Sequence, residues 1–171
     1  MAGNLEWIPA DEGRDLLAAP VAAAVGPEAR VAAIDPGLAD TAAFCERYEV
    51  PLEISANCVI VAARRGGEVT YAACMVLATD RADVNGVVRK HLGARKVSFA
   101  PMDEATSLTG MEYGGITPVG LPGGWPVLVD EAVAAAGDVV IGSGLRRSKL
   151  LLPGKSLAGL PGAEVIALAQ Q

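Results

Sequence analysis

The sequence is poor in aromatic residues and has no long apolar run, and each shortage excludes a class of function. Phe, Trp and Tyr make up 4% of the 171 residues although 51% are hydrophobic, so Ala, Val, Leu and Ile must build the core. So few rings cannot supply the stacking platforms on which binders of single-stranded RNA depend. No run approaches the ~18 uninterrupted apolar residues of a membrane span, so we expect no membrane partner.

Cysteine and histidine are equally scarce. Cys45, Cys58 and Cys74 show no metal-binding spacing and cannot all pair. With no signal peptide at the N-terminus, they predict reduced thiols in a cytoplasmic protein, and Cys58 and Cys74 lie in apolar runs typical of buried cysteines. The single histidine, His91, lies in a basic helical segment, so we interpret it as a surface residue and exclude a Ser-His-Asp triad. Walker, dinucleotide-binding and zinc-protease motifs are also absent.

The charge is negative overall but unevenly distributed. A net charge of −6 argues against a general nucleic-acid binder, and we expect no DNA partner. Residues 1–63 carry a net charge of −7, whereas residues 64–171 carry +1. The basic residues of the second part cluster near Arg64, Arg95 and Arg146. Such clusters form a local basic face or, more commonly, ordinary solvated surface charge.

Short strands and helices alternate along the chain, which predicts an α/β (α+β) fold with a mixed sheet. The apolar runs 55–63 and 69–78, joined by a basic and glycine-containing turn, predict a hairpin. Asp40 is expected to cap a helix over 41–48, and Asp83 one that ends at Gly93. Further strands are expected at 31–34, 96–100, 126–130, 138–141 and 149–152. No linker divides the chain, so residues 1–171 are expected to form a single domain.

The segment 109–122 is the most informative one. It holds four glycines and two prolines within fourteen residues. Glycine allows a positive φ and a close approach of the backbone, and proline fixes φ, so the loop has a defined shape. The free N–H groups of such a loop can line a small pocket for a polar group. Composition alone favours an ordinary turn, but the order of the segments around the loop favours a site.

Four blocks follow one another in a characteristic order. They are residues 56–61; residues 92–100 with Asp103-Glu104 and 108–110; residues 114–121; and residues 139–144 with Arg146 and Leu150. Each block is weak by itself, but in this order and spacing they resemble the YbaK / prolyl-tRNA-synthetase-associated family of aminoacyl-tRNA editing domains. The resemblance covers residues 54–164, and the N-terminal third matches poorly.

The resemblance implies a compact domain whose curved mixed β-sheet closes toward a barrel surrounded by helices. It also implies a free-standing deacylase that acts in trans on mischarged tRNA, typically alanine or cysteine on proline tRNA. A separate editing site is needed because one methylene contributes only ~1–3 kcal/mol of binding free energy in a synthetase pocket. Such a pocket therefore cannot strongly reject a smaller amino acid. Positioned water and the tRNA hydroxyl suffice for the reaction, so no metal and no cofactor are expected. The implied partners are the tRNA acceptor end and an aminoacyl-tRNA synthetase.

The resemblance also places a site. Backbone groups of the glycine loop would hold the ester and stabilise an oxyanion, and the basic clusters near Arg64, Arg95 and Arg146 would steer the acceptor stem. The expected catalytic residues are Asn57 and Gly115. The expected substrate-binding residues are Gly114, Gly115, Ile116, Thr117, Pro118, Gly120, Ser143 and Gly144.

Asn57 is a departure from the family pattern, which usually has lysine at this position. Lysine is a natural partner for a phosphate or an ester, whereas Asn offers hydrogen bonds without the charge. Two interpretations therefore stay open: a divergent deacylase, or a catalytically silent module that binds a small amino-acid-like or nucleotide-like ligand or a synthetase. The order of the blocks disfavours a third, an unrelated α+β protein whose loop is only a turn.

Overall fold

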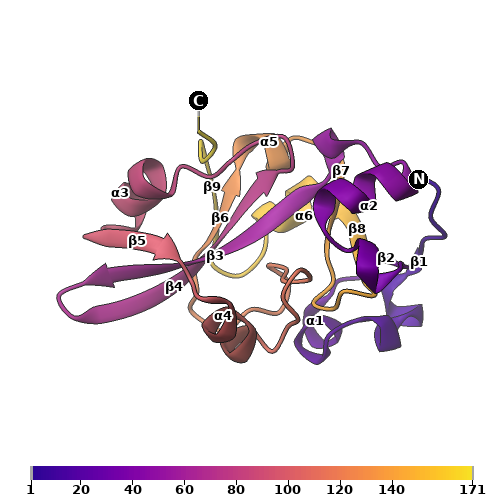
Figure 1. Ribbon diagram of the computed structural model, residues 1–171, viewed down its shortest axis with the longest axis horizontal. Coiled ribbons are helices and arrows are strands. Elements are labelled where there is room, and N and C mark those ends of the chain that lie inside the picture. The colour runs from indigo at the N-terminus through magenta and orange to yellow at the C-terminus, as the bar shows by residue number, and fades with distance from the viewer. Residues whose placement is uncertain (1, 171) are drawn as a thin grey trace.

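The computed structural model describes residues 2–170, which form two β-sheets with short helices around them (Figure 1). The first sheet is antiparallel, and its strands in spatial order are β1 (Ile8–Pro9), β2 (Arg30–Ala33), β8 (Ser148–Pro153) and β7 (Asp138–Gly142). The second sheet has the order β5 (Lys96–Phe99), β3 (Ala56–Arg65), β4 (Glu68–Leu77), β6 (Val127–Asp130) and β9 (Ala163–Ile166). It is mixed, since β5, β3 and β4 are antiparallel, whereas β6 runs parallel to β4 and β9.

The mixed α/β fold predicted from the sequence is confirmed, with one difference. The strands form two open sheets in place of one curved sheet that closes toward a barrel. The sheets meet where Ser55, the residue before β3, forms an isolated parallel bridge with Val140 of β7. Closure requires a continuous ladder of hydrogen bonds around the barrel, and one bridge does not supply it.

The predicted hairpin is confirmed as β3 and β4, which pair from Ala56–Leu77 to Arg65–Glu68. Gly66 and Gly67 connect the strands, both with positive φ (58° and 84°), as a tight two-residue hairpin turn requires. The hairpin extends away from the first sheet (Figure 1). Its inner half lies beside the first sheet, where the site is found.

The helices are short: α1 (Ala19–Ala24), α2 (Thr41–Tyr48), α3 (Arg89–Leu92), α4 (Met102–Thr109), α5 (Glu131–Ala134) and α6 (Gly154–Ala158). The carboxylate of Asp83 accepts hydrogen bonds from the N–H groups of Gly86 and Val87, and Gly93 ends α3 at a positive φ, so both predicted helix signals are confirmed. Asp40 precedes α2 as expected, but its side chain makes no capping hydrogen bond. Within residues 2–170, no helix combines the length and apolar character needed to cross a membrane.

The core is aliphatic, as the composition requires. Its largest fully buried side chains are Phe44, Met75, Leu128, Ile141, Leu150, Leu157 and Leu168. Side chains on the two faces of β8 enter different parts of this core, because successive residues of a strand point to opposite sides. Leu150 and Leu152 pack between the sheets, whereas Leu151 packs beneath α2 with Phe44.

Candidate functional site

A cleft with a volume of about 450 Å³ lies where the two sheets meet. Its walls are formed by the start of α2, the first half of β3, the end of β5, α4, the glycine loop and the facing ends of β7 and β8. Its lining residues are Ala39, Asp40, Thr41, Ala56, Asn57, Cys58, Val59, Ile60, Phe99, Ala100, Ala105, Tyr113, Gly114, Ile116, Gly142 and Lys149. Of the site residues expected from the sequence, Asn57, Gly114 and Ile116 line this cleft.

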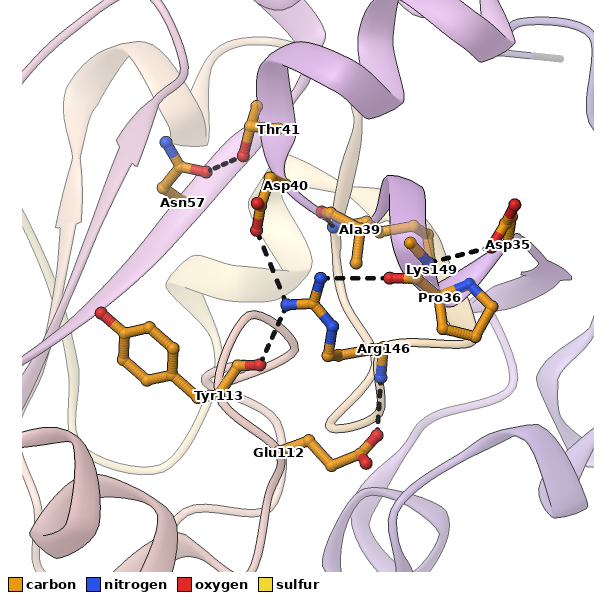
Figure 2. A network of polar contacts seen from close by, with 11 residues as sticks. Asp35, Pro36, Ala39, Asp40, Thr41, Asn57, Glu112, Tyr113, Arg146 and Lys149 are labelled. Carbon is orange, nitrogen blue, oxygen red and sulfur yellow. Dashed lines mark hydrogen bonds and ion pairs between the residues drawn. The ribbon is translucent and has the colours of Figure 1, made fainter.

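Asn57 is held in a defined orientation on β3. Its Oδ1 accepts a hydrogen bond of 2.6 Å from the hydroxyl of Thr41, the first residue of α2 (Figure 2). An amide whose oxygen is occupied in this way keeps its two N–H donors for another partner. Asn57 therefore presents a neutral hydrogen-bond donor to the cleft.

Gly115 anchors the loop on the turn between β7 and β8. Its N–H donates to the carbonyl of Glu112 (2.9 Å), and its own carbonyl accepts from the N–H of Gly144 (2.7 Å). A Cβ at this position would lie 2.8 Å from the carbonyl group of Leu145. Gly115 is therefore buried in the contact between the loop and the turn. Its neighbours Gly114 and Ile116 line the cleft, whereas Gly115 itself does not.

The neighbours of Gly115 offer the cleft two backbone donors. Among residues 2–170, the N–H groups of Gly114 and Ile116 have no hydrogen-bond acceptor, and both residues line the cleft. Unpaired N–H groups beside a concave surface are suited to binding a carbonyl oxygen or an oxyanion. The loop thus provides donors without a charged side chain.

The remaining predicted residues are placed in three ways. The Ser143 hydroxyl lies 3.0 Å from the carbonyl oxygens of Leu145 and Ser148, and Gly144 bonds Gly115, so both residues shape the turn behind the cleft. Thr117 is fully buried, and its hydroxyl has no partner within the described part of the chain. Pro118 and Gly120 face a separate hollow beside Trp125. Contact of any of these residues with a substrate stays a prediction.

Arg146 ties together the segments at the rim of the cleft (Figure 2). Its guanidinium lies 3.6 Å from the carboxylate of Asp40 and donates to the carbonyls of Tyr113 (3.3 Å) and Pro36 (3.1 Å). Its backbone N–H donates to the carboxylate of Glu112 (2.8 Å). Arg146 thus connects the segment before α2 to the glycine loop, and the Asp40 carboxylate, which does not cap the helix, is paired with this arginine.

The other two basic clusters lie apart from the cleft. Arg64 is in the outer part of β3, where its guanidinium donates to the hydroxyl of Ser98 (3.3 Å), and its carbonyl accepts from the N–H of Arg95. Neither side chain lines the cleft. A role of these two clusters in steering tRNA stays a prediction, whereas Arg146 has a structural role at the site itself.

Lys149 is the residue that sequence reasoning missed, since it belongs to the basic cluster near Arg146, for which surface charge is the commoner interpretation. It lies within β8 and is only 8% exposed. Its ammonium group donates to the carbonyl of Ala39 (3.1 Å) and lies 5.1 Å from the centre of the Phe44 ring. Burial lowers the pKa of Lys149 from 10.5 to about 8, although Cys45 and Asp40 act in the opposite direction. A lysine inside an apolar strand was the available signal.

The cysteine in the cleft is not poised as a nucleophile. Cys58 lines the wall, and burial raises the pKa of its thiol far above the ordinary value. The thiolate is the reactive form of cysteine, so Cys58 contributes a small apolar surface. Residues 2–170 contain no group of three or more His, Cys, Asp or Glu side chains that could hold a metal ion.

The buried charge of Lys149 should be measurable as a cost in stability. The unfolded chain binds the lysine proton more tightly, so the penalty is complete below pH 8 and disappears as the pH rises from about 8 toward 10.5. We expect Lys149→Met to raise the free energy of unfolding by about 2 kcal/mol at pH 7, which is the relief of this penalty less the lost hydrogen bond to Ala39.

Thermal unfolding at pH 7 and pH 10 tests this expectation, and the gain should shrink at the higher pH. Lys155→Met, at an exposed position of α6, is the matched control and should show no such pH dependence. A Lys149→Met protein that is less stable than the wild type at pH 7 would show that the lysine stabilises the fold.

The residues that line the cleft fall within a segment of the chain that matches a known protein family. Residues 35–160 match the family described as "Aminoacyl-tRNA editing domain". No curated protein sequence matches the chain. A solved structure of a candidate trans-editing enzyme for prolyl-tRNA synthetase is 21% identical with a TM-score of 0.72, covering 84% of this chain and 87% of that one. A hypothetical protein is 22% identical with a TM-score of 0.74, covering 83% and 91%. At these identities the structural likeness shows the fold.

Proposed function

This chain belongs to the aminoacyl-tRNA editing domain family, and on this premise we propose that it is a deacylase that acts in trans on mischarged tRNA. The observation that carries the proposal is the cleft itself. It brings the amide of Asn57 into one cleft with the free N–H groups of Gly114 and Ile116. This arrangement supports hydrolysis of an ester, whose carbonyl oxygen needs hydrogen-bond donors as negative charge develops on it.

The walls of the cleft support a small amino acid as the acyl group. Four alanines line it, at positions 39, 56, 100 and 105, together with the apolar side chains of Cys58, Ile60 and Ile116. A site of this kind accepts a small apolar side chain and rejects a larger one by steric exclusion, which is what a second sieve requires. We therefore propose alanine or cysteine on proline tRNA as the substrate.

In the proposed reaction, a water molecule adds to the carbonyl carbon of the aminoacyl ester. The N–H groups of Gly114 and Ile116 would hold the carbonyl oxygen as it becomes an oxyanion, and Asn57 would orient the ester from β3. The bond between the carbonyl carbon and the ribose oxygen then breaks, and that oxygen takes up the proton that the water has lost. The products are the free amino acid and uncharged tRNA.

A second groove supports a path for the acceptor end. It shares Asn57, Val59 and Phe99 with the cleft, and it is lined by Lys96 of β5 and by Arg81 of the segment that follows β4. Both bases are exposed, and the Phe99 ring is 67% exposed at the junction. Cations along a groove can bind phosphates, and an exposed ring can stack on a base.

Binding of tRNA should therefore weaken steeply as salt is added. We expect Lys96→Gln to reduce the slope of log affinity against log salt by about one, because one phosphate contact is lost. Lys155→Gln is the matched control, since Lys155 is an exposed lysine that lines neither hollow. A flat salt response of the wild type, or equal effects of both variants, would exclude phosphate contacts in this groove.

The proposal is tested by deacylation of a panel of aminoacyl-tRNAs with the purified protein. The panel begins with alanine- and cysteine-charged proline tRNA and includes serine- and threonine-charged species. Hydrolysis above the rate without enzyme would support the deacylase and identify its substrate. Silence of the folded protein across the panel would favour the binding module, whose neutral Asn57 would then explain the lost reaction.

A further inference from the structure

Lys149 is a buried cation that has no anionic partner. Within residues 2–170, no carboxylate lies at ion-pair distance from its ammonium group. One of its three N–H donors is occupied by Ala39, so two remain for another acceptor. Because Lys149 lines the cleft, a ligand bound there can supply that acceptor.

The charged and titratable groups around Lys149 do not neutralise it. The Cys45 thiol on α2 is itself buried, which raises its pKa and keeps it uncharged. The side chain of Asp40 is 79% exposed and is paired with Arg146, whose own positive charge opposes that of Lys149. The Phe44 ring contributes only a weak cation–π contact. An uncompensated buried charge is costly and is found where a site uses it.

We propose that Lys149 is a catalytic residue of the deacylation, donating a hydrogen bond to the acyl carbonyl oxygen of the bound ester and stabilising the negative charge formed when water adds. This inference rests on the proposed function. Lys149 keeps its proton throughout: water supplies the oxygen, the ester C–O bond breaks, and the ribose oxygen receives the proton from the water. The lysine acts together with the backbone donors of the loop.

The same inference accounts for the neutral residue on β3. Asn57 and Lys149 line one cleft from different sheets. A lysine at position 57 would place a second ammonium group in the cleft, and like charges disfavour each other in a partly dry site. In this chain Lys149 of β8 supplies the positive charge, and Asn57 of β3 serves as a neutral hydrogen-bond donor whose side-chain oxygen is held by Thr41.

Three variants test the proposal: Lys149→Met, Asn57→Lys and the double variant, each with the substrate found in the panel. In steady-state experiments, Lys149→Met should lower kcat by about 100-fold with little change in KM, the usual effect of losing one oxyanion donor. Asn57→Lys alone should give no gain. In the Lys149→Met background, the same change should restore kcat at least about tenfold, because the cleft regains one cation. A merely structural lysine would not produce this rescue.

The dependence of kcat/KM on pH provides an independent readout. In the wild type it should fall above pH 8 as the ammonium group, whose pKa is lowered to about 8, loses its proton. Lys149→Met should lack this fall. Should Lys149→Met fail to fold, Lys149→Gln keeps a polar donor without the charge and should show a similar loss of kcat.

The outcomes separate this inference from the proposed function. A folded Lys149→Met or Lys149→Gln protein whose kcat stays within about threefold of the wild type would overturn the role of Lys149 while the deacylase stands. A wild type that hydrolyses no member of the panel would overturn the deacylase and this role with it. Loss of kcat with rescue by Asn57→Lys would support both.

Discussion

Replacing Gly115 by valine is expected to abolish deacylation while the protein stays folded. The new Cβ would lie 2.8 Å from the Leu145 carbonyl group, so the loop must move away from the turn between β7 and β8. That movement would displace the N–H groups of Gly114 and Ile116 on either side. A misplacement of about 1 Å at a reacting centre can cost 100-fold in rate, and we expect at least that loss in kcat/KM.

The fold should survive because the strain falls on a connecting loop outside the sheets, at a cost of about 1–3 kcal/mol. Gly123→Val is the matched control. A Cβ at Gly123 has no atom within 4 Å, and that position does not line the cleft. Activity and thermal unfolding of the two variants should be measured side by side. A Gly115→Val protein as active as the Gly123→Val protein would remove the loop from the site.

Replacing Arg146 by alanine is expected to lower kcat/KM by about 10- to 100-fold with only a small fall in stability. The guanidinium connects Pro36, Asp40 and Tyr113, which belong to segments on both sides of the cleft. Without the guanidinium, the glycine loop and the start of α2 are no longer fixed relative to each other. The hydrogen-bond donors at the cleft then lose their alignment with the substrate. The stability cost stays small because these contacts are at a partly exposed rim.

Two variants make the comparison specific. Arg146→Lys keeps the charge but cannot make the same set of bonds with one planar group, so it should fall between the wild type and Arg146→Ala. Arg147→Ala removes the adjacent arginine, whose guanidinium donates to the carbonyl of Asp15 and does not line the cleft. If Arg147→Ala and Arg146→Ala reduced kcat/KM equally, the effect could not be assigned to the clamp at the rim.

Local patterns in the sequence predicted the elements of this fold well. The hairpin followed from two apolar runs around a glycine turn, and the helix that ends at Gly93 followed from a start and a stop signal. Such signals depend on a few neighbouring residues, so they can be recognised without knowledge of the tertiary structure. The division of the strands into two sheets did not follow, because strand pairing over long distances leaves no local signature.

The site was predicted only in part, for the same reason. Asn57, Gly114 and Ile116 line the cleft as expected, whereas Gly115 acts one residue behind it and Pro118 and Gly120 face another hollow. The sequence shows that a loop is rich in glycine. It does not show which of its N–H groups are consumed by hydrogen bonds to a distant turn.

The chain by itself determined the aliphatic core, the order of strands and helices, and the family to which the blocks of residues belong. Only the tertiary structure decided that Lys149 is a cation of the cleft and Arg146 a clamp, although the two bases stand three positions apart in one basic cluster. Their environments differ because Lys149 lies on a central strand that α2 covers, while Arg146 lies in a partly exposed turn at the rim of the cleft. Burial and partners depend on what packs against a residue, and that is settled only when distant segments meet.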